Sequence, residues 1–303
     1  MSPPTEPALV TLEGVDISHP DKELWPDAGV TKADLARYWV AVADAALPHL
    51  RDRPVSMERF PDGIEAGGFY EKKLPSHFPD HVDRVTVTTS DGEQDQVVVS
   101  DVRTLVHLAQ QACVTPHTWL SRRPELDHPD LLVVDLDPSG SDLAAVRRAA
   151  RVVGEALDDL GLVPFLKTTG SRGYHVAAPV RPDEGFDDVR ALATDLAGLL
   201  ARRHPDLLTT AARKADRGEL VYLDVLRNGY GQTIVAPYAP RARPGAPVST
   251  PITWDELSRT PPDRFDLDGV RARLARTGDP WAGMRRRARG LGRPRERLAR
   301  LLR

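Results

Sequence analysis

The sequence has little of three features that would narrow its class at once: cysteine, long apolar runs and net charge. Its 303 residues include one cysteine, Cys113, so neither an internal disulfide nor a zinc cluster of the Cys-x-x-Cys type can form. No apolar run approaches the roughly 20 residues of a membrane-spanning helix, and the N-terminus lacks the apolar core of a secretory signal. We therefore expect a cytoplasmic protein with no membrane partner.

The small net charge of −3 bears on the partners of the chain. A polyanion such as DNA would have to meet a local basic surface, because the molecule as a whole does not attract it. Arginine and proline are plentiful and lysine is scarce, which is typical of genomic base bias and decides nothing about function.

The composition that is present fits a soluble globular protein, with 41% hydrophobic and 28% charged residues. Strand and helix patterns alternate without a composition break or an internal repeat, which predicts an α/β fold with mixed sheets. We expect one unit over residues 1–303, in which two lobes are an open alternative, with disorder at 1–8. The basic tail at 284–303 either contacts nucleic acid or is a solvated end, and the sequence leaves both open.

The periodicity of apolar residues predicts the order of the elements. Helices are expected at 32–46, 101–112, 142–160 and 187–203, and strands at 9–17, 54–60, 163–169, 174–180, 220–226 and 231–237. Asp91-Gly92 predicts a hairpin turn, Thr31 an N-cap, and Thr253 with Glu256 a capping box.

The strand expected at 131–140 organises the candidate site. Four apolar residues lead into Asp135 and Asp137, which project from the same face because side chains alternate along a strand. Adjacent carboxylates repel, and an oxygen-preferring cation such as Mg²⁺ or Mn²⁺ relieves that repulsion. Asp224 interrupts a second apolar strand and needs a donor or a metal if it is buried. Alternatively, the aspartates are solvated residues at strand ends.

Two further stretches carry polar groups that suit phosphates. The turn at 170–173 is framed by glycines and places Ser171 and Arg172 near His175, which together offer donors to an anion. Lys32 opens a helix, whose N-terminus favours phosphate, and Lys22 precedes it in a loop. Ordinary surface lysines are the alternative for this pair.

Aromatic and basic residues alternate elsewhere with spacing that suits unpaired bases. Phe69 and Tyr70 follow a glycine-rich loop and are flanked by Arg59, Lys72 and Lys73, so they could stack on unpaired bases beside a phosphate track. Alternatively, one of the two rings faces the core. Arg241 and Arg243 alternate on one side of a later segment.

Several motifs in order resemble the polymerase domain of bacterial ligase D, a member of the archaeo-eukaryotic primase superfamily. They are H-P-D-K-E-L-W-P with Thr31-Lys32, R-F-P-D-G with F-Y-E-K-K, D-L-D-P, K-T-T-G-S-R-G-Y-H-V, and Y-L-D-V-L-R-N with Q-T-I-V-A-P-Y-A-P-R-A-R-P-G-A-P-V-S. The resemblance runs from about residue 10 to 260 and implies a primase-like catalytic core.

The resemblance implies a metal-dependent nucleotidyltransferase of non-homologous end joining. It would fill gaps and extend ends at double-strand breaks, using nucleoside triphosphates and often favouring ribonucleotides. Its DNA substrate would carry a gap or 3′ overhang and a 5′-phosphate, and the protein would be associated with the nucleoid. Its protein partners would be Ku and a separate ATP-dependent DNA ligase, since no K-x-D-G ligase motif is present in this sequence.

The resemblance also implies residue roles. Two Mn²⁺ or Mg²⁺ ions would be held by Asp135, Asp137 and Asp224. The incoming triphosphate would be surrounded by His117, Lys167, Ser171, Arg172, His175, Arg217, Arg241 and Arg243. The 5′-phosphate would be bound by Lys22 and Lys32 with Arg59 nearby, and the template base would stack on Phe69 and Tyr70.

Two departures from the family pattern stand out. His19 occupies a position where many members have asparagine, and the loop before Phe69 is short, which affects template positioning. Two rival functions remain. A D-x-D phosphatase with Asp135 as nucleophile does not explain Asp224, and a non-catalytic module that binds and bridges DNA ends predicts binding without synthesis.

Overall fold

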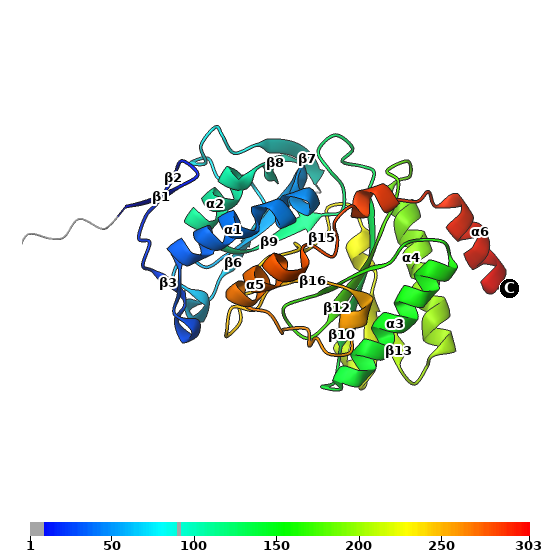
Figure 1. Cartoon of the computed structure of the whole chain (residues 1–303). Helices are drawn as coiled ribbons and strands as arrows, with labels where there is room; N and C mark the ends of the chain where they lie inside the picture. Colours follow the sequence, from blue (N-terminus) through cyan, green and yellow to red (C-terminus); the bar gives the residue numbers. More distant parts are fainter. Residues whose placement is uncertain (1–8, 90–91) are drawn as a thin grey trace, which may run out of the picture.

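The computed structural model describes residues 9–89 and 92–303 (Figure 1). Residues 1–8, for which disorder is expected, and Asp91 of the expected hairpin turn lie outside the described residues. The chain forms two β-sheets side by side, each with helices against it, so the predicted α/β class with mixed sheets is confirmed. No helix in the described part of the chain is both long and apolar enough to cross a bilayer.

The first sheet has the strand order β15-β9-β5-β8-β7, with β6 paired to β5, and its pairs are antiparallel. Helices α1 and α2 pack against it. The bounds are α1 (Lys32–Leu50), β5 (Arg53–Arg59), β6 (Phe69–Glu71), β7 (Arg84–Thr89), β8 (Gly92–Val99), α2 (Val102–Gln110), β9 (Cys113–Trp119) and β15 (Thr233–Val235).

The second sheet has the order β13-β14-β10-β12-β11-β16, in which only β13 and β14 are parallel. Helices α3 and α4 cover one face of it. The bounds are β10 (Leu131–Pro138), α3 (Leu143–Asp159), β11 (Phe165–Thr168), β12 (Tyr174–Pro179), α4 (Phe186–Arg203), β13 (Leu208–Thr209), β14 (Val221–Asp224) and β16 (Pro251–Ile252).

The remaining elements are short or peripheral. Helix α5 (Leu267–Thr277) packs against α1, and α6 (Gly292–Leu301) packs against α4. Two small sheets pair β1 (Val10–Leu12) with β2 (Val15–Ile17) and β3 (Glu23–Trp25) with β4 (Val30–Thr31). The 3-10 helices are η1 (Pro26–Ala28), η2 (Ile64–Ala66), η3 (Lys214–Asp216), η4 (Leu226–Asn228), η5 (Trp254–Glu256) and η6 (Met284–Arg287).

Each sheet has its own hydrophobic core, and a third cluster joins them. The third cluster includes Val133 of β10, Ile234 of β15 and the buried Trp281. The Trp281 indole N–H donates to the Leu166 carbonyl of β11 at 2.9 Å. This cluster fixes how the two sheets face one another.

Local sequence signals account for the helix ends. Thr31 and Asp34 form a reciprocal capping box at α1, and Asp142 caps α3 by accepting from the Ala144 N–H. The expected single strand at 9–17 is wrong, because Glu13 and Gly14 take positive φ and turn the chain into the β1–β2 hairpin. The expected strand at 220–226 ends at Asp224, where η4 follows.

Candidate active site and nucleic-acid interface

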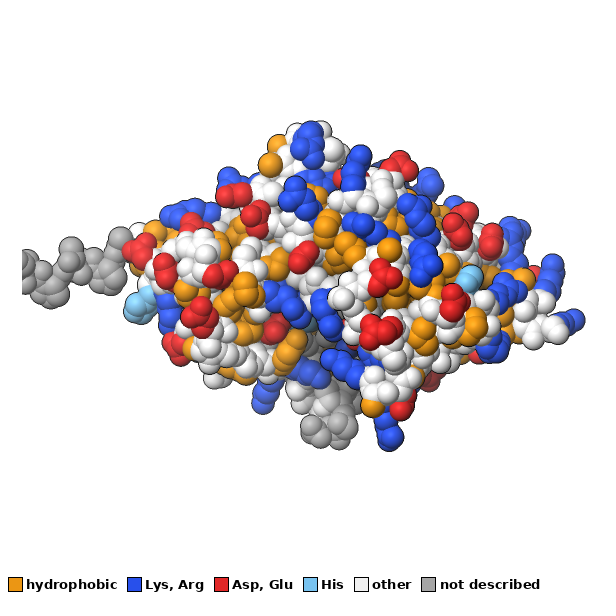
Figure 2. Space-filling model, turned by 90° about the horizontal axis from the view of Figure 1, so that it is seen from below, with side chains coloured by type: hydrophobic (Ala, Val, Ile, Leu, Met, Phe, Trp, Pro, Cys, Tyr) orange, Lys and Arg blue, Asp and Glu red, His pale blue; other side chains and the backbone are white. Residues whose placement is uncertain are grey.

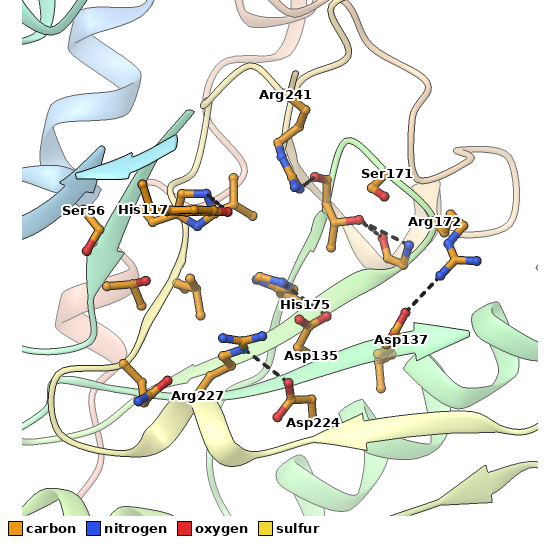
Figure 3. A pocket seen from close by; sticks show the side chains of 18 of the residues that line it. Ser56, His117, Asp135, Asp137, Ser171, Arg172, His175, Asp224, Arg227 and Arg241 are labelled. Carbon is orange, nitrogen blue, oxygen red and sulfur yellow. Dashed lines mark hydrogen bonds and ion pairs between the residues drawn. The ribbon is translucent and has the colours of Figure 1, made fainter. Parts of the chain in front are cut away.

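A cleft of about 450 Å³ lies between the two sheets (Figure 3). Strands β5 and β9 and the segment through β15 form one wall, and β10, β12 and the segment after β14 form the other. Among the charged and polar residues that line it are Ser56, Tyr70, Lys72, His117, Asp135, Asp137, Ser171, Arg172, His175, Lys214, Asp224, Arg227, Gln232, Arg241 and Arg243.

Strand register brings the three predicted aspartates to one edge of this cleft. On β10, Leu132, Val134 and Leu136 belong to the core under α3 and α4, so Asp135 and Asp137 project from the opposite face. Asp135 is directly opposite Asp224 in the antiparallel β10–β14 ladder, and Asp137 is opposite Tyr222. The Asp135 and Asp224 side chains therefore leave neighbouring strands on the same side of the sheet.

The environment separates the ionisation of the two paired carboxylates. Burial alone would raise the pKa of Asp135, but His175, whose Nε2 lies 3.3 Å from Asp135 Oδ1, holds that pKa below its ordinary value. Burial and the charge of Asp135 raise the pKa of Asp224 even though Arg227 lies 3.2 Å away. Burial, followed by the charge of Lys167, lowers the pKa of His175 to about 4.

Arginine side chains hold two of the aspartates in this structure. Arg217 Nη1 donates to Asp137 at 2.8 Å and Arg172 lies 3.6 Å from the same carboxylate, while Arg227 holds Asp224. With the side chains in these positions, no group of three or more His, Cys, Asp or Glu in residues 9–89 and 92–303 could hold a metal ion.

The donor set nevertheless fits a hard divalent cation. Three carboxylates on two adjacent strands supply oxygen ligands, which Mg²⁺ and Mn²⁺ prefer, and they face an open cleft. The raised pKa of Asp224 reflects burial and the neighbouring negative charge of Asp135, and a bound cation would relieve both. Metal binding by Asp135, Asp137 and Asp224 remains a prediction.

The glycine-framed turn between β11 and β12 presents Ser171 and Arg172 to the cleft. A Cβ on Gly173 would lie 2.0 Å from the Leu136 carbonyl oxygen, so only glycine fits where the turn crosses β10. Arg241 Nη1 donates to the Thr169 carbonyl at 2.7 Å, which fixes this arginine beside the same turn.

His117 lies on the opposite wall, on β9. Its Nε2 is 3.2 Å from Glu58 Oε2 and 3.3 Å from the Tyr70 hydroxyl. Burial lowers the His117 pKa, and the Glu58 hydrogen bond opposes that shift. Figure 3 shows His117 and Ser56 across the cleft from the aspartates.

Two predicted triphosphate ligands lie behind the cleft surface. Lys167 is fully buried, its Nζ donates to Ser249 Oγ at 2.6 Å, and burial lowers its pKa well below the ordinary value. Arg217 is also buried, stacked 4.0 Å above the Tyr222 ring, with its donors directed at Asp137 and at backbone carbonyls. Both side chains therefore donate to neighbouring protein groups and do not extend into the cleft.

The three basic residues expected at the 5′-phosphate lie in one region. The Lys32 N–H donates to the Lys22 carbonyl at 2.8 Å, and Lys32 Nζ donates to the Ser18 carbonyl at 2.8 Å. Burial, then the charges of Lys22 and Arg59, lower the Lys32 pKa to about 8. Lys22 also pairs with Asp62 at 2.7 Å, and Arg59 donates to the Gln111 carbonyl at 2.8 Å.

The two expected stacking aromatics are both exposed, Phe69 by 47% and Tyr70 by 58%. Tyr70 lines the cleft and its ring centroid lies 5.2 Å from that of His117. The Arg59 guanidinium lies 5.5 Å from the Phe69 ring centroid. Neither ring faces the core, which removes the alternative that one of them is a core residue.

Sequence reasoning missed three charged residues of this site: Glu58, Lys214 and Arg227. Arg227 had a usable signal, because it follows Asp224 by three residues. Glu58 had none, since its pairing with His117 depends on the register between β5 and β9.

Comparison with known proteins identifies relatives. The family model described as "LigD, primase-polymerase domain" matches residues 31–281. A multifunctional non-homologous end joining protein LigD of Pseudomonas aeruginosa is 33% identical over 273 residues, 89% of this chain and 32% of that protein. LigD of Mycobacterium tuberculosis is 33% identical over 274 residues, 88% of this chain and 36% of that protein. The chain thus spans about a third of the length of these relatives.

A solved structure is also similar. The polymerase domain of ligase D from Mycobacterium tuberculosis, in complex with DNA, superimposes with a TM-score of 0.84 at 33% identity. The match covers 90% of this chain and 99% of that one.

Proposed function

The chain belongs to the LigD primase-polymerase domain family, and on that premise we propose that it is a template-directed nucleotidyltransferase of double-strand break repair. It fills gaps and extends 3′ ends during non-homologous end joining, acting on chromosomal DNA in the cytoplasm. Its substrates are nucleoside triphosphates, with ribonucleotides accepted, and its cofactors are two Mn²⁺ or Mg²⁺ ions.

One observation carries this proposal: Asp135 and Asp224 are register partners on adjacent strands, with Asp137 two residues along on the same face. A phosphatase that uses Asp135 as a nucleophile has no role for a third carboxylate on a second strand. A structural role is also a poor fit, because all three face an open cleft lined with arginines.

The reaction is in-line attack of a primer 3′-hydroxyl on the α-phosphorus of a nucleoside triphosphate, with pyrophosphate as the leaving group. Divalent ions bound by the three aspartates would lower the pKa of the hydroxyl and neutralise the leaving group. Ser171, Arg172, Arg241 and Arg243 supply donors and positive charge to the phosphates. His175, whose Nε2 lies 3.3 Å from Asp135 Oδ1, lowers the Asp135 pKa against the effect of burial and so favours the ionised carboxylate.

The DNA is positioned by the first sheet and its flanking loops. Lys22, Lys32 and Arg59 bind the 5′-phosphate across the gap, and the exposed Phe69 and Tyr70 support the template base. Ku and an ATP-dependent DNA ligase are the partners that this reaction needs to complete a repair.

The test is incorporation of labelled nucleotide into gapped DNA with Mn²⁺, Mg²⁺ or a chelator. Asp137→Ala should lower incorporation by about 10³-fold or more while leaving binding of the gapped DNA largely intact, because it removes a cation ligand and not a DNA contact. Asp206→Ala is the matched control, since Asp206 is exposed and outside the cleft lining. Normal incorporation by Asp137→Ala would contradict the proposal, and release of phosphate without incorporation would support the phosphatase instead.

A further inference from the structure

The last residues of the chain form a surface whose charge opposes that of the whole molecule. Residues 285–303 contain nine arginines, one glutamate and no lysine or aspartate. Taking this +8 away from the net charge of −3 leaves −11 for the rest of the chain. We call residues 285–303 the C-terminal arginine surface.

Three of the four arginines of α6 lie on its exposed face. Pro294 and Leu298 are buried, so one face of the helix packs on the protein, where α6 meets α4. Arg293, Arg297 and Arg300 recur at the spacing i, i+4, i+7 and are exposed. Figure 1 shows α6 at the outer end of the part of the molecule that contains the second sheet, and Figure 2 shows Lys and Arg side chains gathered at that end.

Few of these charges are neutralised. Arg295 pairs with Glu184 and with Asp188 at 3.2 Å, and Arg297 donates to the Asp159 carbonyl at 2.9 Å, which fastens α6 to the neighbouring helices. Within the part of the chain that the structure describes, Arg293 and Arg300 have no acidic partner within 4.0 Å. The surface is therefore positioned by two arginines and leaves the others open to a ligand.

The chain's arginine-rich composition does not account for this surface. Helices α3 and α4 are also exposed on one side, and each carries three arginines balanced by three acidic residues. Helix α6 carries four arginines and one glutamate. What distinguishes α6 is its single acidic residue, because arginine-rich base composition does not by itself predict a shortage of acidic residues.

The chemistry of the surface favours a polar polyanion. Guanidinium groups bind phosphate in a bidentate fashion, and a ten-residue helix of about 15 Å spans several phosphates of a duplex. A lipid surface fits less well, because an interfacial helix inserts its apolar face, and here that face is buried against the protein. The surface also lies beyond residue 281, where the family match ends.

We propose that the C-terminal arginine surface is a second DNA-binding surface, separate from the cleft, that holds the phosphate backbone of duplex DNA without reading its sequence. The choice of DNA rests on the proposed function, whereas the surface itself does not. Through this surface the enzyme binds duplex DNA even when nucleotide, metal ion and gap are absent.

The test uses the full chain and a blunt 40-base-pair duplex with 5′-hydroxyl ends, in a chelator and without nucleotide. The variant is Arg287→Gln/Arg293→Gln/Arg300→Gln. The control, Arg148→Gln/Arg151→Gln/Arg203→Gln, removes three exposed charges from α3 and α4. Duplex affinity should fall about tenfold or more in the variant only, with the slope of log K against log salt smaller by about 2 to 3, since each lost phosphate contact removes about 0.9.

Two measurements keep the result interpretable. Thermal unfolding should be the same for both variants, and the nucleotide KM on a short gapped substrate should be unchanged. Equal loss in variant and control, or duplex binding like that of the unaltered chain, would overturn the proposal. So would polyglutamate of equal charge displacing the duplex as well as unlabelled duplex does, because the surface would then be an acidic-protein site. Failure of the proposed function would show only in the incorporation assay, which is separate from this one.

Discussion

At the scale of single residues, Lys32 is a lysine whose surroundings bring its pKa close to neutral pH. It is buried, donates to Ser18, and shares its region with Lys22 and Arg59. Its pKa of about 8 lies below the ordinary value, so the charged form dominates at pH 7 and is lost as the pH rises through 8. Arginine at this position would keep its charge throughout that range.

The preference for a 5′-phosphorylated gap should therefore fall several-fold between pH 7 and pH 9. Bound phosphate raises the lysine pKa, so the midpoint in the complex should lie above 8, while the phosphate itself stays fully ionised. Band shifts with and without the 5′-phosphate, at fixed ionic strength, measure this preference. Lys32→Arg should show a preference that is flat with pH, and a pH-dependent loss in that variant would assign the effect to another group.

Whether a residue of the site could be predicted from the sequence depends on how many neighbouring residues are needed to recognise it. Asp135 and Asp137 could be predicted because a D-x-D pair after an apolar run is visible within ten residues. Asp224 could be predicted because a carboxylate inside an apolar strand is costly to bury unless a donor or a metal ion binds it. Glu58 could not, because a contact across two strands depends on register. The burial of Lys167 behind the cleft was also out of reach, since a lysine in a short strand gives no signal of which side covers it.

At the scale of elements, the turn between β11 and β12 depends on one glycine. A Cβ on Gly173 would lie 2.0 Å from the Leu136 carbonyl oxygen. Neither the turn backbone at residue 173 nor the β10 backbone at Leu136 can move away without disturbing the β10–β12 ladder. Both the stability of the second sheet and the position of Ser171 and Arg172 follow from that close approach.

Gly173→Ala should lower the free energy of unfolding by roughly 1–3 kcal/mol, as overpacking does, and raise the nucleotide KM. Urea unfolding and single-nucleotide addition kinetics measure the two effects. Gly292→Ala is the control, since nothing lies within 4 Å of its added Cβ and it begins a helix. A Gly173→Ala protein with unchanged stability would mean that the ladder tolerates the shift.

The four expected helices, α1 to α4, could be predicted within a few residues because each has an amphipathic pattern, and three of them begin at a capping side chain, as at Thr31 and Asp142. Short strands fared less well. The β1–β2 hairpin was merged into one strand because a turn formed by Glu13 and Gly14 breaks the alternation for only two residues. Strand ends were displaced at β14 and β15, where neighbouring 3-10 and extended segments continue the apolar pattern.

At the scale of the whole molecule, Trp281 links the two sheets. It is buried, donates to Leu166 of β11, and its ring centroid lies 5.6 Å from that of His49 in α1. Because the cleft lies between the two sheets, its shape depends on the relative position that Trp281 helps to fix. The sequence alone could predict strands for both sheets but not which strand joins which sheet, because that assignment rests on contacts between distant segments.

Trp281→Ala should lower the free energy of unfolding by about 3–5 kcal/mol, the usual effect of removing a buried tryptophan. The measurement is urea unfolding followed by far-UV circular dichroism. Leu301→Ala, at a side chain that is 43% exposed, should change stability by less than about 0.5 kcal/mol. A loss below 1 kcal/mol for Trp281→Ala would show that the linking cluster adds little to holding the sheets together.

The path of the chain has a consequence for its biosynthesis. The first sheet receives its last strand, β15, only after the second sheet's β10 to β14 have been made, and its core also includes Leu267 and Val270 of α5. A nascent chain released from the ribosome up to residue 230 would therefore lack an edge strand and part of the packing of its N-terminal half. Its two halves must mature together, late in translation, which places a long interval of exposed apolar surface before the native state is reached.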